Sequence, residues 1–185
     1  MTGSEELVFD TGPLRHFAQQ QWLVVLRFIT ANRRVVIPES VEEELKLQAG
    51  SDSRLVPLLD CDWITVHRTG DLSFVAAFAN YARQLVDREG HNRGECGVLA
   101  LGHVHGWEMV LDDSTPRSIA ESENLDVTAT VPLLCRAIAE KQLTVPMVEA
   151  LADDLLANSY YLPFGPGGFR RHVLENGLLD YDDVS

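Results

Sequence analysis

The chain has 185 residues, of which 45% are hydrophobic, and carries a formal net charge of −13 at pH 7. This length and apolar content predict one globular domain with a buried core. The negative charge argues against a protein that holds nucleic acid through clustered lysine and arginine, but it does not exclude a nuclease whose carboxylates bind a metal ion.

The cysteines and the apolar runs exclude two further classes of protein. Cys61, Cys96 and Cys135 form neither a CxxC pair nor an even set, which argues against a disulfide scaffold or a cysteine zinc site. The longest apolar run, residues 22–29, is interrupted by Arg27 and is too short to span a bilayer. Since the amino terminus also lacks the pattern of a secretion signal, we expect a cytoplasmic protein with no membrane role.

Apolar runs alternate with amphipathic segments in the first half of the chain, a pattern typical of a parallel sheet covered by helices on both faces. The strands expected there are residues 6–10, 34–38 and 63–67. The helices expected between and after them run from Pro13 to about residue 30, over residues 39–48, and from residue 71 to about residue 88. Residues 50–53 are expected to form a loop.

The second half continues the alternation. A helix is expected to begin near residue 94, a strand to cover residues 107–113, and a helix to follow with Thr115 as N-cap and Pro116 at its first position. A short strand at residues 126–130 and helices at 131–141 and 145–157 complete the predicted fold. The remaining residues are expected to form a turn-rich loop and an acidic tail.

Aspartates end two of the predicted strands. Asp10 follows the first apolar run, and the pair Asp112 and Asp113 ends the strand at residues 107–113. Because the carboxyl ends of parallel strands meet at one edge of the sheet, these side chains could lie close together. The alternative is that each aspartate only caps a turn or the next helix.

Two glutamates on predicted helices strengthen the first interpretation. Helical spacing puts Glu95 on the same face as Val98 and Leu99, where a buried carboxylate needs a partner, although the helix dipole could also stabilise it. In the VEEEL segment, Glu44 flanks the buried stripe and can reach a cleft, whereas Glu43 points to water. A glutamate run of this kind is usually a solvated helix face.

Four converging carboxylates would repel one another unless a hard cation bound them. Oxygen-only ligands select Mg²⁺ or Mn²⁺ over zinc. Such a site is suited to phosphodiester hydrolysis, because the metal activates a water molecule and offsets charge on the phosphate.

Four segments, in this order, resemble the PIN domain family, in particular its bacterial members related to VapC-type toxins. They are FDTGPL, VIPESVEEEL, NRGECGVLALG and MVLDDSTPRSIAE. The resemblance covers roughly residues 6–157 and implies a three-layer α/β/α sandwich with a central, mostly parallel sheet. It also implies an endoribonuclease that uses Mg²⁺ or Mn²⁺.

The resemblance assigns roles to particular residues. It places the catalytic acids at Asp10, Glu44, Glu95 and either Asp112 or Asp113, with Asp10, Glu95, Asp112 and Asp113 as candidate metal ligands. Two substrate-binding residues follow from it, and they are Thr11 and Arg117. An ion pair of Arg117 with Asp113 or Glu121 is the structural alternative.

The resemblance also suggests partners and a domain division. The partners are an RNA substrate, a small antitoxin protein and a second copy of the chain in a homodimer. We expect residues 1–160 to form the PIN-like nuclease domain and residues 161–185 to be a C-terminal extension packed on it or trailing it.

Two other functions are weighed against this one. A PIN-like binding module could act through a protein partner without cleavage. A phosphatase with Asp10 as nucleophile is disfavoured, because Gly12 stands where that mechanism needs a second aspartate. His103 and His105 are poor joint metal ligands, since side chains two apart on a helix diverge.

Overall fold

The computed structural model describes residues 5–87, 90–158 and 160–183. Within this part of the chain, five strands form one sheet in the order β3-β2-β1-β4-β5, and every neighbouring pair is parallel. The strands are β1 (Glu6–Phe9), β2 (Arg34–Pro38), β3 (Ile64–His67), β4 (Glu108–Val110) and β5 (Val127–Thr128). The predicted parallel sheet is therefore confirmed.

The central strands are apolar along their whole length because both faces of the sheet are covered. Val8 in β1 lies opposite Val36 in β2 and Met109 in β4, and all three side chains are buried. Strand β2 has the predicted bounds, and the other strands lie inside theirs. Since β1 and β4 are parallel neighbours, Asp10 and the Asp112–Asp113 pair follow the ends of adjacent strands and lie at the same edge of the sheet.

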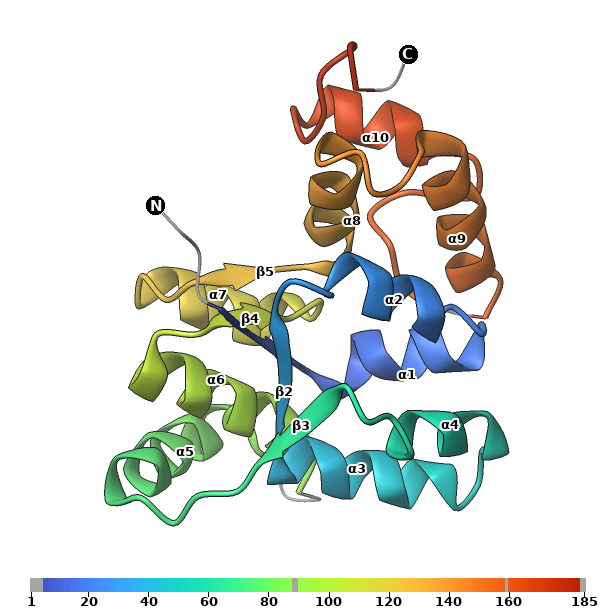
Figure 1. Cartoon of the computed structure of the whole chain (residues 1–185). Helices are drawn as coiled ribbons and strands as arrows, with labels where there is room; N and C mark the ends of the chain where they lie inside the picture. The colour runs from blue at the N-terminus through green and yellow to red at the C-terminus, as the bar shows by residue number, and fades with distance from the viewer. Residues whose placement is uncertain (1–4, 88–89, 159, 184–185) are drawn as a thin grey trace.

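Helices form a layer on each face of this sheet, which gives the predicted α/β/α sandwich. Figure 1 shows α1, α2 and α4 on one side of the sheet and α5, α6 and α7 on the other. The helices are α1 (Thr11–Gln19), α2 (Leu23–Ile29), α3 (Glu39–Ala49), α4 (Val56–Leu59), α5 (Leu72–Leu85), α6 (Arg93–His105), α7 (Ser114–Ser122), α8 (Thr130–Ala139), α9 (Val145–Ala157) and α10 (Phe169–Glu175), with a 3₁₀ turn at Ser53–Leu55.

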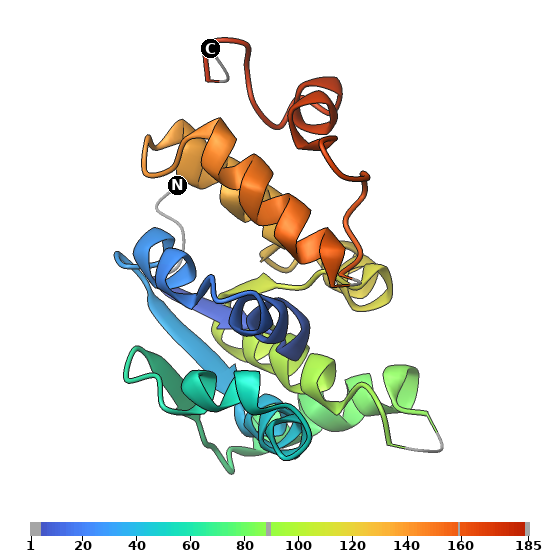
Figure 2. The same ribbon diagram turned by 90° about the vertical axis from the view of Figure 1, so that its right-hand side faces the viewer.

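The last three helices gather at the β5 edge of the sheet, as both views show (Figures 1 and 2). Phe169, Val173 and Leu179 are buried members of the same hydrophobic core as β1. The segment after residue 160 therefore packs against the rest of the chain. No helix in the described ranges is both long enough and apolar enough to cross a membrane.

Several predicted boundaries were wrong. The helix expected from Pro13 to about residue 30 is two helices, because Gln21 adopts a left-handed φ of 62° and the amide of Trp22 donates to the Phe17 carbonyl at 2.8 Å. The N-cap of α7 is Asp113 rather than Thr115, whose amide donates to the Asp113 carboxylate at 3.3 Å. The short helices α4 and α10 were missed, and the predicted helix end at residue 88 lies outside the described residues.

A buried cluster of charged side chains lies at the start of β4, at the opposite end of the strand from Asp112 and Asp113. Glu108, at the start of β4, is only 4% exposed. It accepts hydrogen bonds from Arg136 at 2.7 and 3.1 Å and another from Arg33, whose guanidinium also donates to the Glu6 carbonyl at 2.9 Å. Burial alone would raise the pKa of Glu108, but the two arginines outweigh it and lower the pKa. The cluster therefore ties β4 to α8 and to the chain before β2.

Replacing Glu108 with glutamine is expected to lower the free energy of unfolding by about 2–4 kcal/mol, because two arginines lose their shared anion. Since the folded-state pKa of Glu108 is depressed, its stabilisation is present above the ordinary carboxyl pKa and is lost as the pH falls through the folded value. Urea unfolding at pH 7 and at pH 3 measures both effects. A difference between the two proteins that is as large at pH 3 as at pH 7 would contradict this account.

Candidate active site

A cleft of about 850 Å³ opens at the edge of the sheet where β1 and β4 end. All seven residues that the sequence predicted for the site line it. They are Asp10, Thr11, Glu44, Glu95, Asp112, Asp113 and Arg117. The structure thus brings together residues that come from α1, α3, α6, α7 and the ends of two strands.

Asp10 lies at the base of the cleft as the N-cap of α1. Its Oδ2 accepts a 3.4 Å hydrogen bond from the amide of Gly12, whereas its Oδ1 has no hydrogen-bond partner among the described residues. The residue is 6% exposed. Burial raises the pKa of Asp10, and the negative charges of Glu95 and Glu44 raise it further. Asp10 is therefore both a helix cap and a poorly compensated carboxylate.

Glu44 connects the beginnings of two helices. Its Oε2 accepts a 2.6 Å hydrogen bond from the Thr11 hydroxyl, and its Oε1 accepts a 2.7 Å hydrogen bond from the amide of Gly94. A Cβ atom on residue 94 would lie 2.7 Å from Oε2, so only glycine leaves room for this carboxylate. The Thr11 hydroxyl thus orients Glu44, and Glu44 holds α1 and α6 in place.

Glu95 extends into the cleft from the first turn of α6. It is partly buried, while Val98 and Leu99 on the same helix are fully buried. Burial raises the pKa of Glu95, and the charges of Glu44 and Asp113 add to that rise. The carboxylates of the cleft therefore repel one another, as the sequence suggested.

The structure distinguishes Asp112 from Asp113. Asp112 accepts hydrogen bonds from the amide of Thr130 at 2.7 Å, from the Thr130 hydroxyl at 2.6 Å and from the Tyr160 hydroxyl. Asp113 is exposed and accepts only the Thr115 amide in the described structure. Only Asp113 of the two contributes to the raised pKa of Glu95. Asp112 is thus used in anchoring α8 and the segment after α9, and Asp113 is the better candidate ligand.

The Arg117 side chain is bound by neighbouring backbone carbonyls and by Glu121. Its guanidinium donates to the backbone carbonyls of Asp112 at 3.1 Å and Leu111 at 3.4 Å, and it approaches Glu121 at 3.9 Å. Of the two ion pairs considered from the sequence, the one between Arg117 and Glu121 is therefore present in the structure. Its hydrogen bonds hold the end of β4 against α7.

Comparison with known families decides the identity of the fold. A family model described as a PIN domain matches residues 6–164. The chain belongs to the PIN domain family. This confirms the family to which the four sequence segments pointed, while no curated protein matches the chain. A PIN domain is a nuclease fold, so the carboxylate cleft is the candidate site of a hydrolase.

The side chains of this PIN domain cleft offer oxygen ligands to a metal ion. In the described ranges, no group of three or more histidine, cysteine, aspartate or glutamate side chains is arranged to hold one as it stands. Two observations still fit a divalent cation: the unpaired Oδ1 of Asp10, and the raised pKa values of Asp10 and Glu95, to which burial contributes most and the neighbouring carboxylates add. Both would be relieved by a hard cation with oxygen ligands.

The PIN domain cleft also contains residues that the sequence did not single out. Arg15 donates a 3.0 Å hydrogen bond from its guanidinium to Nε2 of His16, and the His16 ring packs on Tyr160 with ring centroids 4.1 Å apart. Burial lowers the pKa of His16 to about 4, and the charge of Arg15 contributes to this effect. No local pattern marks Tyr160, because it reaches the cleft from 144 residues beyond His16 in the chain.

Proposed function

We propose that this PIN domain is an endoribonuclease that depends on Mg²⁺ or Mn²⁺. The observation that carries the proposal is the convergence of five carboxylates in one cleft, with Asp10 buried and one of its oxygens unpaired. Asp10, Glu95 and Asp113 would hold the metal, and Asp112 would support them by fixing the end of β4. When bound, the cation would activate water and offset negative charge on the phosphate.

Glu44 supports the site in this proposal without holding the metal. Glu44 keeps the starts of α1 and α6 at their spacing through Thr11 and Gly94. Glu95 would share the metal with Asp10 and Asp113, and the cation would offset the negative charges of Glu44 and Asp113 beside it. Attack of water on phosphorus would break the bond to the 3′-oxygen and leave a 5′-phosphate and a 3′-hydroxyl.

The resemblance to VapC-type toxins extends the proposal to partners. On that basis the chain would be the toxin of a toxin–antitoxin pair, would bind a small antitoxin protein, and would form a homodimer. Growth arrest on expression, relieved by a small protein encoded next to this chain, would support the toxin role. Unimpaired growth during expression of a protein that is active in vitro would contradict it.

RNA cleavage by the purified protein is the direct test of the nuclease proposal. We expect cleavage with Mg²⁺ or Mn²⁺ and none after chelation. Glu95→Gln should lower the rate by about 100-fold or more, because it removes a charged ligand of the proposed metal. Glu43→Gln is the matched control, because Glu43 is exposed and outside the cleft.

Two outcomes would contradict the proposal in different ways. A wild-type protein that binds Mn²⁺ but cleaves no RNA would favour the binding module. A folded Glu95→Gln variant as active as the wild type would show that the chemistry takes place elsewhere.

A further inference from the structure

Part of the cleft lining carries none of the proposed metal ligands. Arg15 from α1, Leu47 and Gln48 from α3, and Tyr161 from the segment after α9 form it beside the carboxylates. Nine buried side-chain nitrogen or oxygen atoms in the described residues lack a hydrogen-bond partner, and four of them belong to residues of this cleft. The four are Asp10 Oδ1, Arg15 Nε, His16 Nδ1 and Gln48 Oε1. Asp10 Oδ1 is assigned to the proposed metal. Because buried polar groups are normally paired, the other three indicate a place for a polar ligand.

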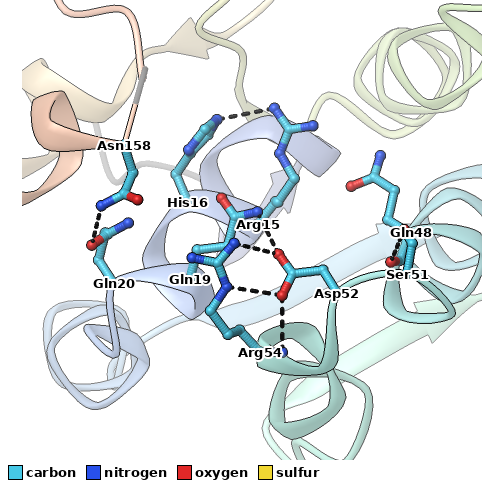
Figure 3. Close-up of polar contacts among 9 residues, drawn as sticks. All are labelled: Arg15, His16, Gln19, Gln20, Gln48, Ser51, Asp52, Arg54 and Asn158. Carbon is cyan, nitrogen blue, oxygen red and sulfur yellow. Dashed lines mark hydrogen bonds and ion pairs between the residues drawn. The ribbon is translucent and has the colours of Figure 1, made fainter.

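Arg15 carries a positive charge that no carboxylate neutralises in the described structure. Its hydrogen-bond partner is the ring of His16, which is neutral at physiological pH. Figure 3 shows the Arg15 guanidinium meeting the His16 ring, away from the Asp52 carboxylate that holds Arg54. Arg117, the other arginine of the cleft, is engaged by two carbonyls and Glu121. Arg15 is thus the arginine available to bind an anion there.

Two large apolar side chains stand exposed at the same cleft. Tyr161 is 86% exposed and Leu47 is 81% exposed, although both line the opening. The neighbouring Tyr160 is buried, packs on His16 and donates to Asp112, so the backbone that presents Tyr161 is fixed. An exposed aromatic ring on a fixed backbone suits stacking with an unpaired base.

We propose that Arg15 and Tyr161 form a nucleotide-binding subsite that makes the cleft select unpaired RNA. Arg15 binds a backbone phosphate, and Tyr161 stacks on a base of the same strand. This inference rests on the proposed ribonuclease function. The net charge of −13 makes the subsite necessary, because the protein as a whole repels RNA and local contacts must provide the affinity.

Binding of a short fluorescent single-stranded RNA, with Ca²⁺ in place of Mg²⁺ so that the RNA is recovered intact, tests the subsite. Arg15→Ala should raise the Kd by about tenfold and reduce the slope of log Kd against log salt by about 0.7, the loss of one phosphate contact. Tyr161→Ala should raise the Kd by about tenfold without changing the slope, because stacking is not ionic. Tyr161→Phe should bind as the wild type does.

Matched controls lie outside the cleft. Arg83 on α5 donates to the side-chain oxygen of Asn80, an uncharged partner, and Tyr181 is 77% exposed. Arg83→Ala and Tyr181→Ala should leave the Kd unchanged. Arg15→Lys retains the charge and should keep the salt slope, which separates loss of the phosphate contact from loss of local structure.

The outcomes separate this inference from the proposed function. If the wild type cleaves RNA but Arg15→Ala and Tyr161→Ala bind it as tightly as the wild type, the subsite is wrong and the nuclease remains. If the wild type neither binds nor cleaves RNA, both proposals fail. A duplex that binds as tightly as the single strand would contradict stacking on Tyr161.

Discussion

Replacing Asp10 with asparagine is expected to abolish metal-dependent cleavage and, at the same time, to raise the melting temperature of the metal-free protein. The loss of activity should exceed about 100-fold, because a charged ligand is removed from the proposed metal site. The gain in stability follows because the buried carboxyl group, close to Glu95 and Glu44, must either carry an unfavourable charge or take up a proton when the protein folds, whereas asparagine is neutral without that cost. We expect a gain of about 2 kcal/mol, or about 4–8 °C.

Asp10 should also make the stability of the metal-free protein depend on pH. The folded-state pKa of Asp10 is raised, so between about pH 4 and about pH 8 the folded protein binds more protons than the unfolded chain. Asp10 therefore makes the metal-free protein less stable as the pH rises through that window. Thermal unfolding of both proteins across this range, with and without Mn²⁺, measures the effect. Mn²⁺ should stabilise the wild type and have little effect on Asp10→Asn.

Asp52→Asn is the matched control for Asp10→Asn. Asp52 caps the 3₁₀ turn outside the cleft, and its pKa is lowered by hydrogen bonds from Arg54 and Gln19. Removal of a compensated charge should not raise the melting temperature. An Asp10→Asn protein that melts at or below the wild-type temperature without metal would contradict the account of Asp10 as a strained carboxylate.

Substitution of the adjacent aspartates is expected to separate stability from activity. Asp112→Asn should lower the free energy of unfolding by about 2–3 kcal/mol and the melting temperature by about 4–12 °C. The amide nitrogen cannot accept the hydroxyl hydrogen bonds of Thr130 and Tyr160, and this loss outweighs the relief of the burial that raises the pKa of Asp112. Asp113→Asn should leave stability nearly unchanged, since asparagine and aspartate cap helices about equally well. It should nevertheless remove most of the cleavage activity.

Melting temperature and cleavage rate, measured on both variants, check this division. Tyr160→Phe is the control, because it removes only the hydroxyl that donates to Asp112 and should reproduce part of the Asp112→Asn destabilisation. A stable Asp112→Asn protein, or an Asp113→Asn protein that cleaves RNA normally, would reverse the roles assigned to the two residues.

The sequence was informative where the determinants of structure are local. Strand β2 and helix α9 have their predicted bounds, because a continuous apolar run or an amphipathic period ends at a clear break. The break between α1 and α2 was missed, because a run of three glutamines carries no breaker signal and the left-handed turn at Gln21 depends on the later packing of Trp22. The short helices α4 and α10 are likewise held by contacts with the core.

In the candidate site, too, the sequence predicted the features that depend on local pattern and missed those that depend on contacts between distant residues. Asp10, Glu95 and the Asp112–Asp113 pair were found because each stands at the end of a strand or the start of a helix. The difference between Asp112 and Asp113 could not be predicted, since it depends on Thr130 and Tyr160. Arg15 and Tyr161 carry no local signal either, because they line one cleft only when the end of α9 has packed beside the end of α1.

The bridge between Glu44 and Gly94 has a consequence for sequence variation in related chains. The amide of Gly94 binds one oxygen of Glu44, and a methyl group at residue 94 would meet the other oxygen at 2.7 Å. Neither position can therefore change alone without loss. Among chains with this arrangement, alanine at the position of Gly94 should occur only where a shorter residue replaces Glu44, so the two positions should vary as a pair.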